Sequence, residues 1–396
     1  MDYRFTPEAE ALKPSAIREI LKLSFAPGVI PFSAGNPAPE AFPAEAVAGI
    51  TAQILEKTPI AALQYSVTEG FEPLREELLV RAKAKALANE RDRILITAGA
   101  QQVMSLASAA LAGRGDTILC ENPSFVGAIN AFKLTGARVV GVDMEEDGLN
   151  LNKLEDALRR EENVKLLYVI PNFQNPTGIT TSEEKRRALY RLARQYDFLI
   201  IEDDPYGELY FQGAPPCPIK SLDTDGRVIY AGSFSKVLSP GLRVGWCIAD
   251  EALIAKFTAL KQTQDVHTNI MAQMIAHRFL TAYPFEEHLT FLRKLYARKA
   301  ALCLGEAEKH LAPEITFTRP AGGLFAWCAL PEGYDDFPLR ALREKQVAVV
   351  PGGAFRVQPA EPERCFRINF STPTDEQIVR GMERLGELKR VMARGR

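Results

Sequence analysis

The chain has 396 residues, of which 46% are hydrophobic and 25% are charged, and its formal net charge is −2. These proportions are typical of a globular protein with a large core and about two domains, and they argue against nucleic acid or an anionic membrane as the main partner. No apolar run reaches the ~18 residues of a membrane span, and the N-terminus has no hydrophobic signal core.

The six cysteines are scattered and contain no C-x-x-C pair. This pattern predicts reduced thiols and a cytoplasmic location rather than a disulfide framework or a zinc site. The four histidines have no ligand spacing, so no metal is expected.

Residues 1–45 are expected to form an irregular arm, because seven prolines interrupt them. Within this arm, residues 15–23 (SAIREILKL) have helical spacing, with Ser15 as a plausible N-cap.

From residue 94 onward, apolar runs rich in β-branched residues alternate with helix-like segments. The expected strands are 94–97, 117–120, 138–142, 166–170, 198–201, 228–231 and 244–248. The expected helices between them are 102–111, 124–134, 151–160 and 182–196. This alternation predicts an α/β fold with a mostly parallel sheet that is covered by helices on both faces.

The remainder of the chain follows a different pattern. A long helical segment is expected from about 252 to 280, then a helix at 293–311, strands at 317, 323–328 and 366–370, and a closing helix at 374–394. We therefore predict a large domain at 46–290 and a smaller α+β domain at 291–396, with part of the arm (1–45) joining the small domain.

Ligands of such sheets bind beyond the carboxyl ends of the strands. Polar or Gly/Pro-rich turns follow the expected strands there, at Gly99-Ala100-Gln101, at 122–125 (NPSF), at 171–178 (PNFQNPTG) and at 203–206 (DDPY). The first of these opens a helix, whose free N–H groups can bind phosphate, although it could equally be an ordinary turn.

The segment 233–246 reads S-F-S-K-x-x-x-P-G-x-R-x-G-W. The amine of Lys236 can form a Schiff base with a carbonyl, and Ser233, Ser235 and Arg243 can hold a phosphate. The alternative is a surface loop with a solvated lysine.

Three further positions could carry chemistry. Asp203, directly after an apolar run, could pair with a protonated pyridine nitrogen or belong to a carboxylate cluster for a metal. Asn175 could donate to a phenolate-like oxygen. Arg367, inside an apolar strand, needs a partner, which could be a substrate carboxylate or a structural carboxylate.

The order of the motifs G-A-Q, N-P-S-F, N-P-T-G, D-x-P-Y, S-F-S-K, R-V-G and a C-terminal arginine is uncommon. Over essentially its whole length the chain resembles the class I and II aminotransferases of pyridoxal 5′-phosphate (PLP) fold type I, and most of all their 2-aminoadipate/kynurenine branch. The resemblance implies that Lys236 carries the cofactor as a Schiff base and moves the proton at the substrate Cα.

The resemblance also implies the other roles. On the cofactor ring it implies Asp203 at the pyridine nitrogen, Tyr206 and Asn175 at the ring oxygen, and Phe125 stacked on the face, where a tyrosine or tryptophan is commoner. It implies that the phosphate is held by Ser233, Ser235, Arg243, the amides of Ala100 and Gln101, and Tyr65 from the other subunit of a homodimer. For the substrate it implies Arg367 and Asn175 at the α-carboxylate and Gly35 in the covering segment.

Two further expectations complete the hypothesis. The bonds Asn122–Pro123 and Asn175–Pro176 are predicted to be cis, from the resemblance and because tight turns must direct short side chains at the cofactor. Arg18, in a short segment between proline-rich stretches, could swing in to pair with a distal substrate carboxylate or could be an ordinary solvated residue.

The predicted function is therefore PLP-dependent transamination, an exchange of amino groups by a ping-pong mechanism between an L-amino acid of broad acidic, aromatic or aliphatic type and a 2-oxo acid, with 2-oxoglutarate as one partner. The alternatives are a PLP-dependent lyase of the same fold and a non-catalytic ligand-sensing domain. The ligand-sensing alternative is disfavoured because no basic N-terminal domain precedes the matching segment in this sequence.

Overall fold

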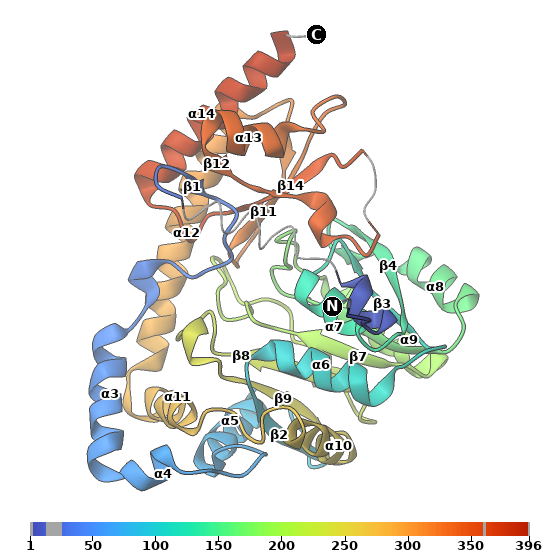
Figure 1. The fold of residues 1–396 in the computed structure, drawn as a ribbon, viewed down its shortest axis with the longest axis vertical. Helices are drawn as coiled ribbons and strands as arrows, with labels where there is room; N and C mark the ends of the chain where they lie inside the picture. Colours follow the sequence, from blue (N-terminus) through green and yellow to red (C-terminus); the bar gives the residue numbers. More distant parts are fainter. Residues whose placement is uncertain (1–2, 13–25, 359–361, 395–396) are drawn as a thin grey trace.

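The computed structural model describes residues 3–12, 26–358 and 362–394. Within them the largest sheet has eight strands in the order β2-β9-β8-β7-β6-β3-β4-β5, and it fills the lower half of the molecule in Figure 1. Its strands are β2 (Asp92–Thr97), β3 (Thr117–Asn122), β4 (Arg138–Glu145), β5 (Gly148–Leu149), β6 (Val164–Val169), β7 (Leu199–Asp203), β8 (Val228–Ser233) and β9 (Gly245–Asp250).

The direction of the strands determines which turns meet. Strands β4, β3, β6, β7 and β8 are parallel to their neighbours in this order. Strand β9 runs antiparallel to both β8 and β2, so β2 points the same way as β8. The carboxyl ends of β2, β3, β6, β7 and β8 therefore share one edge with the start of β9. The predicted mostly parallel α/β sheet is confirmed.

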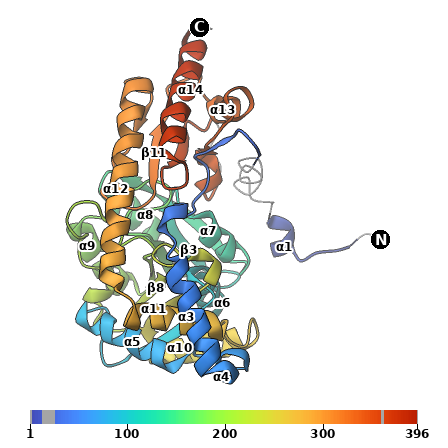
Figure 2. The same cartoon turned by 90° about the vertical axis from the view of Figure 1, so that its left-hand side faces the viewer.

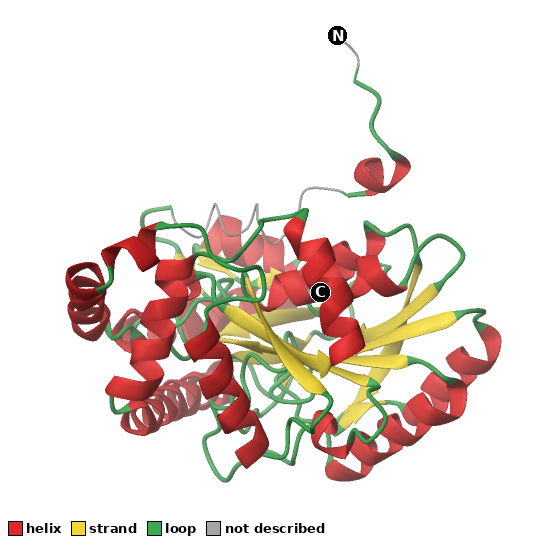
Figure 3. Ribbon diagram, turned by 90° about the horizontal axis from the view of Figure 1, so that it is seen from below, coloured by secondary structure: helices red, strands yellow, loops and turns green. Residues whose placement is uncertain are grey.

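Helices lie on both faces of this sheet (Figure 3). The helices of this part of the chain are α3 (Ala44–Lys57), α4 (Pro59–Leu63), α5 (Glu72–Ala84), α6 (Ala100–Leu111), α7 (Val126–Lys133), α8 (Leu151–Arg160), α9 (Glu183–Tyr196), α10 (Glu251–Gln262) and α11 (Ile270–Ala282), and α3 and α4 pack against α11. Short 3₁₀ turns occur at Pro39–Ala41, Ile219–Leu222, Pro240–Leu242 and Gly352–Phe355.

Helix α8 shows how sequence produces these elements. Asn150 caps its N-terminus by accepting a hydrogen bond from the Lys153 N–H. Leu154, Ala157 and Leu158 recur at helical spacing and are the buried residues of the helix. The cap fixes where the helix begins, and the apolar stripe fixes which face packs on the sheet.

A second, antiparallel sheet of four strands lies above the first in Figure 1, in the order β10-β11-β14-β13. Its strands are β10 (Thr316–Phe317), β11 (Phe325–Ala329), β13 (Val350–Pro351) and β14 (Cys365–Asn369), and the accompanying helices are α12 (Phe285–His310), α13 (Phe337–Lys345) and α14 (Asp375–Arg394). The short strand β1 (Ile30–Pro31) pairs with β12 (Val347–Ala348), so residues of the N-terminal segment contact this part of the chain.

Helix α12 connects the two cores and runs alongside α14 (Figure 2). Leu289, Leu292 and Tyr296 near its start belong to the core that includes the large sheet. Cys303 and Ala307 near its end belong to the core of the second sheet. The boundary predicted at residues 290/291 therefore falls inside a helix that both parts share.

Several expectations about secondary structure were wrong or fall outside the described residues. The long helix expected at 252–280 is two helices, because Val266 adopts a positive φ of 61° and Asn269 caps α11 by accepting from the Ala272 N–H. The helices α3, α4, α5 and α13 were not predicted. The helix predicted at 15–23 lies outside the described residues.

Three further properties bear on function. No helix among the described residues is both long and apolar enough to cross a membrane. The described residues contain no cluster of three or more histidines, cysteines or carboxylates suited to a metal ion. The six cysteines, all within the described ranges, carry free thiols.

Candidate active site

A cavity of about 320 Å³ opens at the carboxyl edge of the large sheet, below the second sheet. Twelve of the residues predicted for the site line it, from seven different segments of the chain: Gly35, Ala100, Gln101, Phe125, Asn175, Asp203, Tyr206, Ser233, Ser235, Lys236, Arg243 and Arg367. The fold therefore brings together side chains that the sequence spreads over more than three hundred residues.

Lys236 follows strand β8, and its Nζ donates a hydrogen bond of 2.7 Å to the carbonyl of Gly35. Burial, followed by the positive charges of Arg367 and Arg243, lowers the pKa of Lys236 from 10.5 to about 8. The amine therefore loses its proton more readily than an exposed lysine, and a neutral amine is the form that attacks a carbonyl.

Asp203 ends strand β7 and is buried. Its Oδ2 accepts a hydrogen bond of 2.7 Å from the hydroxyl of Tyr168, whereas its Oδ1 has no partner among the described residues. Burial raises the pKa of Asp203 from 3.8 to about 7, and the Tyr168 hydrogen bond opposes that shift. A buried carboxylate oxygen without a donor is complementary to a cationic N–H group in the cavity.

The serines and Arg243 lie where three chain segments meet. Ser233 Oγ donates to Ser235 Oγ at 2.9 Å and accepts from the Ser235 N–H at 3.1 Å. Arg243 immediately precedes the antiparallel strand β9, and its guanidinium donates to the carbonyl of Ala98 at 2.9 Å. The N-terminus of α6, at Ala100, lines the same cavity. Hydroxyls, a guanidinium and a helix N-terminus are together suited to a phosphate.

The turn between β2 and α6 requires a glycine at position 99. Its φ is +79°, and a Cβ atom there would lie 2.5 Å from the Arg243 guanidinium. Any larger residue would therefore be strained and would displace Arg243.

Phe125 is held at the N-terminus of α7. Gln101 Nε2 donates to the carbonyl of Gly127 at 2.8 Å, and a Cβ atom on Gly127 would lie 2.5 Å from the Phe125 ring. The ring is therefore packed directly against the backbone of α7 while it lines the cavity. The preceding bond Asn122–Pro123 is cis, as is Asn175–Pro176, and both predictions are confirmed.

Arg367 reaches the cavity from strand β14 of the second sheet. It donates to Asn175 Oδ1 and to the carbonyl of Ser33, each at 2.8 Å, and its Nε has no partner among the described residues. The guanidinium lies 4.2 Å from the ring centroid of Phe325 and 4.8 Å from that of Phe355. Burial lowers the pKa of Arg367 to about 10. No carboxylate accepts from it among the described residues, which leaves the cation available for one from a ligand.

Tyr206 lies opposite Phe325, with the two rings edge to face at 5.8 Å. Burial raises the pKa of Tyr206 above its usual range, so its hydroxyl keeps its proton and acts as a donor.

Sequence reasoning missed Tyr168, Ser33, Phe325 and Phe355. Tyr168 carried one usable signal, because a hydroxyl within a buried strand needs a partner. The carbonyl of Ser33 and the rings of Phe325 and Phe355 carried none, since their role depends on how the two sheets pack.

Two predicted site residues are not in the cavity. Tyr65 is 82% exposed and contacts the ring of His267 edge to face at 5.9 Å. Because its predicted role concerns a neighbouring subunit, a single chain does not test it. Arg18 lies outside the described residues.

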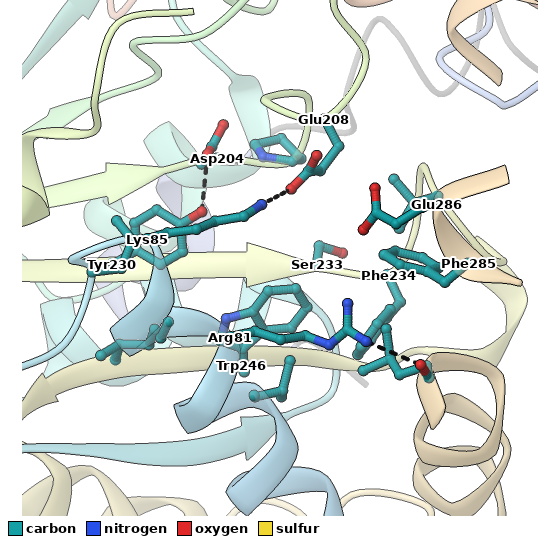
Figure 4. Close-up of a pocket in the computed structure, with 17 residues that line it drawn as sticks. Arg81, Lys85, Asp204, Glu208, Tyr230, Ser233, Phe234, Trp246, Phe285 and Glu286 are labelled. Carbon is teal, nitrogen blue, oxygen red and sulfur yellow. Dashed lines mark hydrogen bonds and ion pairs between the residues drawn. The ribbon is translucent and has the colours of Figure 1, made fainter. Parts of the chain in front are cut away.

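A second cavity of about 130 Å³ is lined by residues of α5, β8 and β9 (Figure 4) and shares Ser233 with the first. Several of its polar groups are paired with one another: Lys85 binds Glu208, and the hydroxyl of Tyr230 donates to Asp204 Oδ2 at 2.9 Å. The cavity that contains Lys236, Arg367 and the Asp203 oxygen without a partner among the described residues is therefore the candidate active site.

Comparison with known proteins agrees with this geometry. The sequence model of the family described as aminotransferase class I and II matches residues 23–385. The chain is 39% identical to the aromatic-amino-acid aminotransferase 1 of Thermococcus litoralis, over 98% of this chain and 94% of that protein. It is 40% identical to the 2-aminoadipate transaminase of Thermus thermophilus, over 98% and 97% of the two chains.

Among solved structures, the kynurenine aminotransferase of Pyrococcus horikoshii in complex with PMP superposes with a TM-score of 0.93. That chain is 36% identical, and the match covers 98% of this chain and 97% of that one.

Proposed function

The chain belongs to the class I and II aminotransferases, and from this premise we propose that it transfers the amino group of an L-amino acid to 2-oxoglutarate or another 2-oxo acid by a ping-pong mechanism. The enzyme is a PLP-dependent transaminase. One observation carries the proposal: a single cavity is lined by a lysine amine, by a buried carboxylate oxygen without a donor and by a guanidinium that binds no carboxylate, as far as the described part of the chain shows.

The residues of the cavity fit PLP, which when bound supplies a reactive aldehyde and a ring that accepts electrons. Asp203 Oδ1, which lacks a donor, would accept from the pyridine N–H. Tyr206 would donate to the ring oxygen, and Asn175 lies at the same side of the cavity. Phe125 would stack on the ring face.

The cofactor phosphate would lie where serine hydroxyls, a guanidinium and the N-terminus of α6 line the cavity. The residues assigned to it are Ser233, Ser235, Arg243 and the amides of Ala100 and Gln101. In the present structure Arg243 donates to a backbone carbonyl, so its guanidinium is already oriented by the segment before α6.

Lys236 is assigned the proton transfer at the substrate Cα. Its lowered pKa of about 8 lies near neutral pH, which suits a group that must both take up and release a proton. The carbonyl of Gly35 accepts from its Nζ and thereby fixes the position of the amine in the cavity.

The substrate α-carboxylate is assigned to Arg367. Its contacts with Asn175 and Ser33 hold the guanidinium still, and the two phenylalanine rings exclude water from it. A carboxylate would therefore gain a charge-assisted bond in a desolvated site.

The active unit is proposed to be a homodimer. An exposed apolar patch is formed by Ile60, Leu63, Tyr65, Val67 and Val266, each at least half exposed. A patch of this kind favours burial against a second copy. This arrangement would bring Tyr65 to the phosphate of the neighbouring site. Mixing Tyr65→Phe subunits with Lys236→Ala subunits should restore part of the activity, and full activity of a dilute monomer would contradict the dimer.

The substrate range is proposed to be broad, from acidic to aromatic and aliphatic side chains, as the printed names of the relatives suggest. Arg18 would pair with a distal carboxylate and swing away for apolar side chains. Arg18→Ala should then lower kcat/KM selectively for glutamate and 2-aminoadipate, by about 1–3 kcal/mol, with leucine and phenylalanine nearly unchanged. Equal losses for all four substrates would contradict this role.

The division of the chain and its location are also proposals. The arm (1–45), the large domain (46–290) and the small domain (291–396) are supported by the two separate cores, which α12 joins. A cytoplasmic location is supported by the six free thiols.

The decisive experiment is borohydride reduction of the purified holoenzyme followed by peptide mapping. A pyridoxyl label should appear on Lys236, and amino transfer from glutamate should depend on a 2-oxo acid acceptor. Label at another lysine would contradict the site, and release of ammonia or pyruvate without an acceptor would favour a lyase.

A further inference from the structure

Glu121, the penultimate residue of β3, is a buried carboxyl group that the proposed function does not use. Its Oε2 accepts two hydrogen bonds, from the Ile170 N–H at 3.1 Å and from Gln174 Nε2 at 3.0 Å. Its Oε1 has no partner among the described residues. Glu121 does not line the cavity, so any effect on the reaction must pass through the groups that it contacts.

Gln174 is fully buried, and its side chain joins three parts of the chain. Its Nε2 donates both to Glu121 and, at 2.8 Å, to the carbonyl of Pro123. Its Oε1 accepts from the backbone N–H and the hydroxyl of Thr177, at 2.9 and 2.8 Å. Both N–H groups and both lone pairs of the amide are thus engaged.

The two turns that Gln174 connects both carry residues of the active site. The turn at Pro123 leads directly to Phe125, and the turn closed by Thr177 contains Asn175. Asn175 Oδ1 in turn accepts from Arg367 at 2.8 Å. A path of hydrogen bonds and backbone therefore runs from Glu121 through Gln174 and the adjoining Asn175 to the guanidinium that is assigned to the substrate carboxylate.

We propose that Glu121 and Gln174 form a buried positioning pair, which locks the Pro123 turn to the Asn175 turn and so holds Asn175 and Arg367 in place for the substrate carboxylate. The inference rests on the proposed function. Glu121 orients the amide of Gln174 by presenting one oxygen to it, since that same oxygen also anchors the backbone at Ile170. Reversal of the amide would place its oxygen against the Glu121 carboxylate and against the Pro123 carbonyl, and both contacts would be repulsive.

Gln174 is oriented by the position of the hydrogen bonds that Glu121 accepts, and not by the charge of Glu121. A glutamine at 121 can still present one oxygen to both donors, so Glu121→Gln keeps the pair. Gln174→Met has nearly the same length but removes every hydrogen bond of the side-chain amide, and so it removes the side-chain link between the Pro123 turn and the Asn175 turn.

The test uses the holoenzyme and 3-phenylpropanoate, which offers a carboxylate and a ring but no amine to react. Binding is followed through the absorbance of the bound cofactor, and the affinity for the cofactor and Tm are measured on the same samples. Gln174→Met should raise the Kd of 3-phenylpropanoate about tenfold and should raise KM more than it lowers kcat, whereas Glu121→Gln should stay within about threefold of wild type. The double variant should be no worse than Gln174→Met alone, because the two residues act as one unit.

Glu202 provides a matched control. It is a buried carboxyl on strand β7, which β6 separates from β3, and it accepts from the N–H groups of Ile219 and Lys220 at 2.8 and 2.7 Å, which belong to neither turn. Glu202→Gln should leave the Kd of 3-phenylpropanoate unchanged, even if Tm changes.

The outcomes separate the two hypotheses. If wild type neither binds the cofactor nor shows saturable binding of 3-phenylpropanoate, the proposed function fails. If wild type binds and Gln174→Met binds equally well, or if Glu202→Gln weakens binding as much as Gln174→Met, the positioning role fails. Should Gln174→Met not fold, Thr177→Val removes the hydroxyl that donates to Gln174 and accepts from the Ile179 N–H at 3.3 Å, and it should weaken binding about threefold; unchanged binding in that variant overturns the proposal.

Discussion

Lys236 should destabilise the cofactor-free protein at neutral pH, and this can be measured. Burial and the positive charges of Arg367 and Arg243 lower its pKa from 10.5 to about 8, so keeping the amine charged in the folded state costs about 3 kcal/mol. The hydrogen bond to Gly35 offsets about 1–2 kcal/mol of this cost. Lys236→Met should therefore raise the free energy of unfolding of the cofactor-free protein by about 1–2 kcal/mol at pH 7.

The sign of the pH dependence follows from proton counting. Below pH 8 both the folded and the unfolded states hold the proton of Lys236. Between about pH 8 and 10.5 the folded state loses it while the unfolded state keeps it, so the stability of wild type rises with pH across this window. By pH 9.5 wild type should recover about 2 kcal/mol, which removes the advantage of Lys236→Met.

The assay is urea unfolding of both proteins after removal of the cofactor, at pH 7 and pH 9.5 and at one protein concentration. Lys256→Met, at an exposed position of α10, is the control and should show no such change between the two pH values. A Lys236→Met protein that is less stable than wild type at pH 7, or a difference that does not shrink with pH, would refute the reasoning.

Three further outcomes are expected. Tyr168→Phe removes the one donor to Asp203 Oδ2, so the pKa of Asp203 should rise further, and the cofactor should dissociate about five- to tenfold more readily in a fluorescence titration; an unchanged Kd would show that this bond is dispensable. Gly99→Ala places a Cβ 2.5 Å from Arg243, so the Kd of the cofactor should rise at least about tenfold, whereas Gly113→Ala, where a Cβ meets nothing within 4 Å, should leave that Kd unchanged. Saturation with cofactor at about 100 times its Kd should stabilise the fold by about 2.7 kcal/mol, seen as a higher Tm, and an equal Tm with and without cofactor would contradict tight binding to the folded state.

Much of the candidate site could be predicted from sequence because its groups sit at the ends of strands. The alternation of apolar runs and helices predicts a parallel sheet, and such a sheet places the turns after its strands at one edge. Lys236, Asp203 and Asn175 were therefore found from their positions directly after apolar runs, before any contact was known. Helix boundaries were predictable where a cap marked them, as at Asn150.

The tertiary structure decided everything that depends on contacts between distant segments. Arg367 meets Asn175 across 192 residues and Ser33 across 334, because the second sheet packs over the edge of the first. Arg243 reaches the same edge only because β9 runs against its neighbours. The pairing of Tyr168 with Asp203 and of Glu121 with Gln174 likewise joins neighbouring strands. Periodicity along a sequence records which face of an element is buried, but it contains no information about which distant side chain will occupy the space opposite, since that is determined by how the completed elements pack.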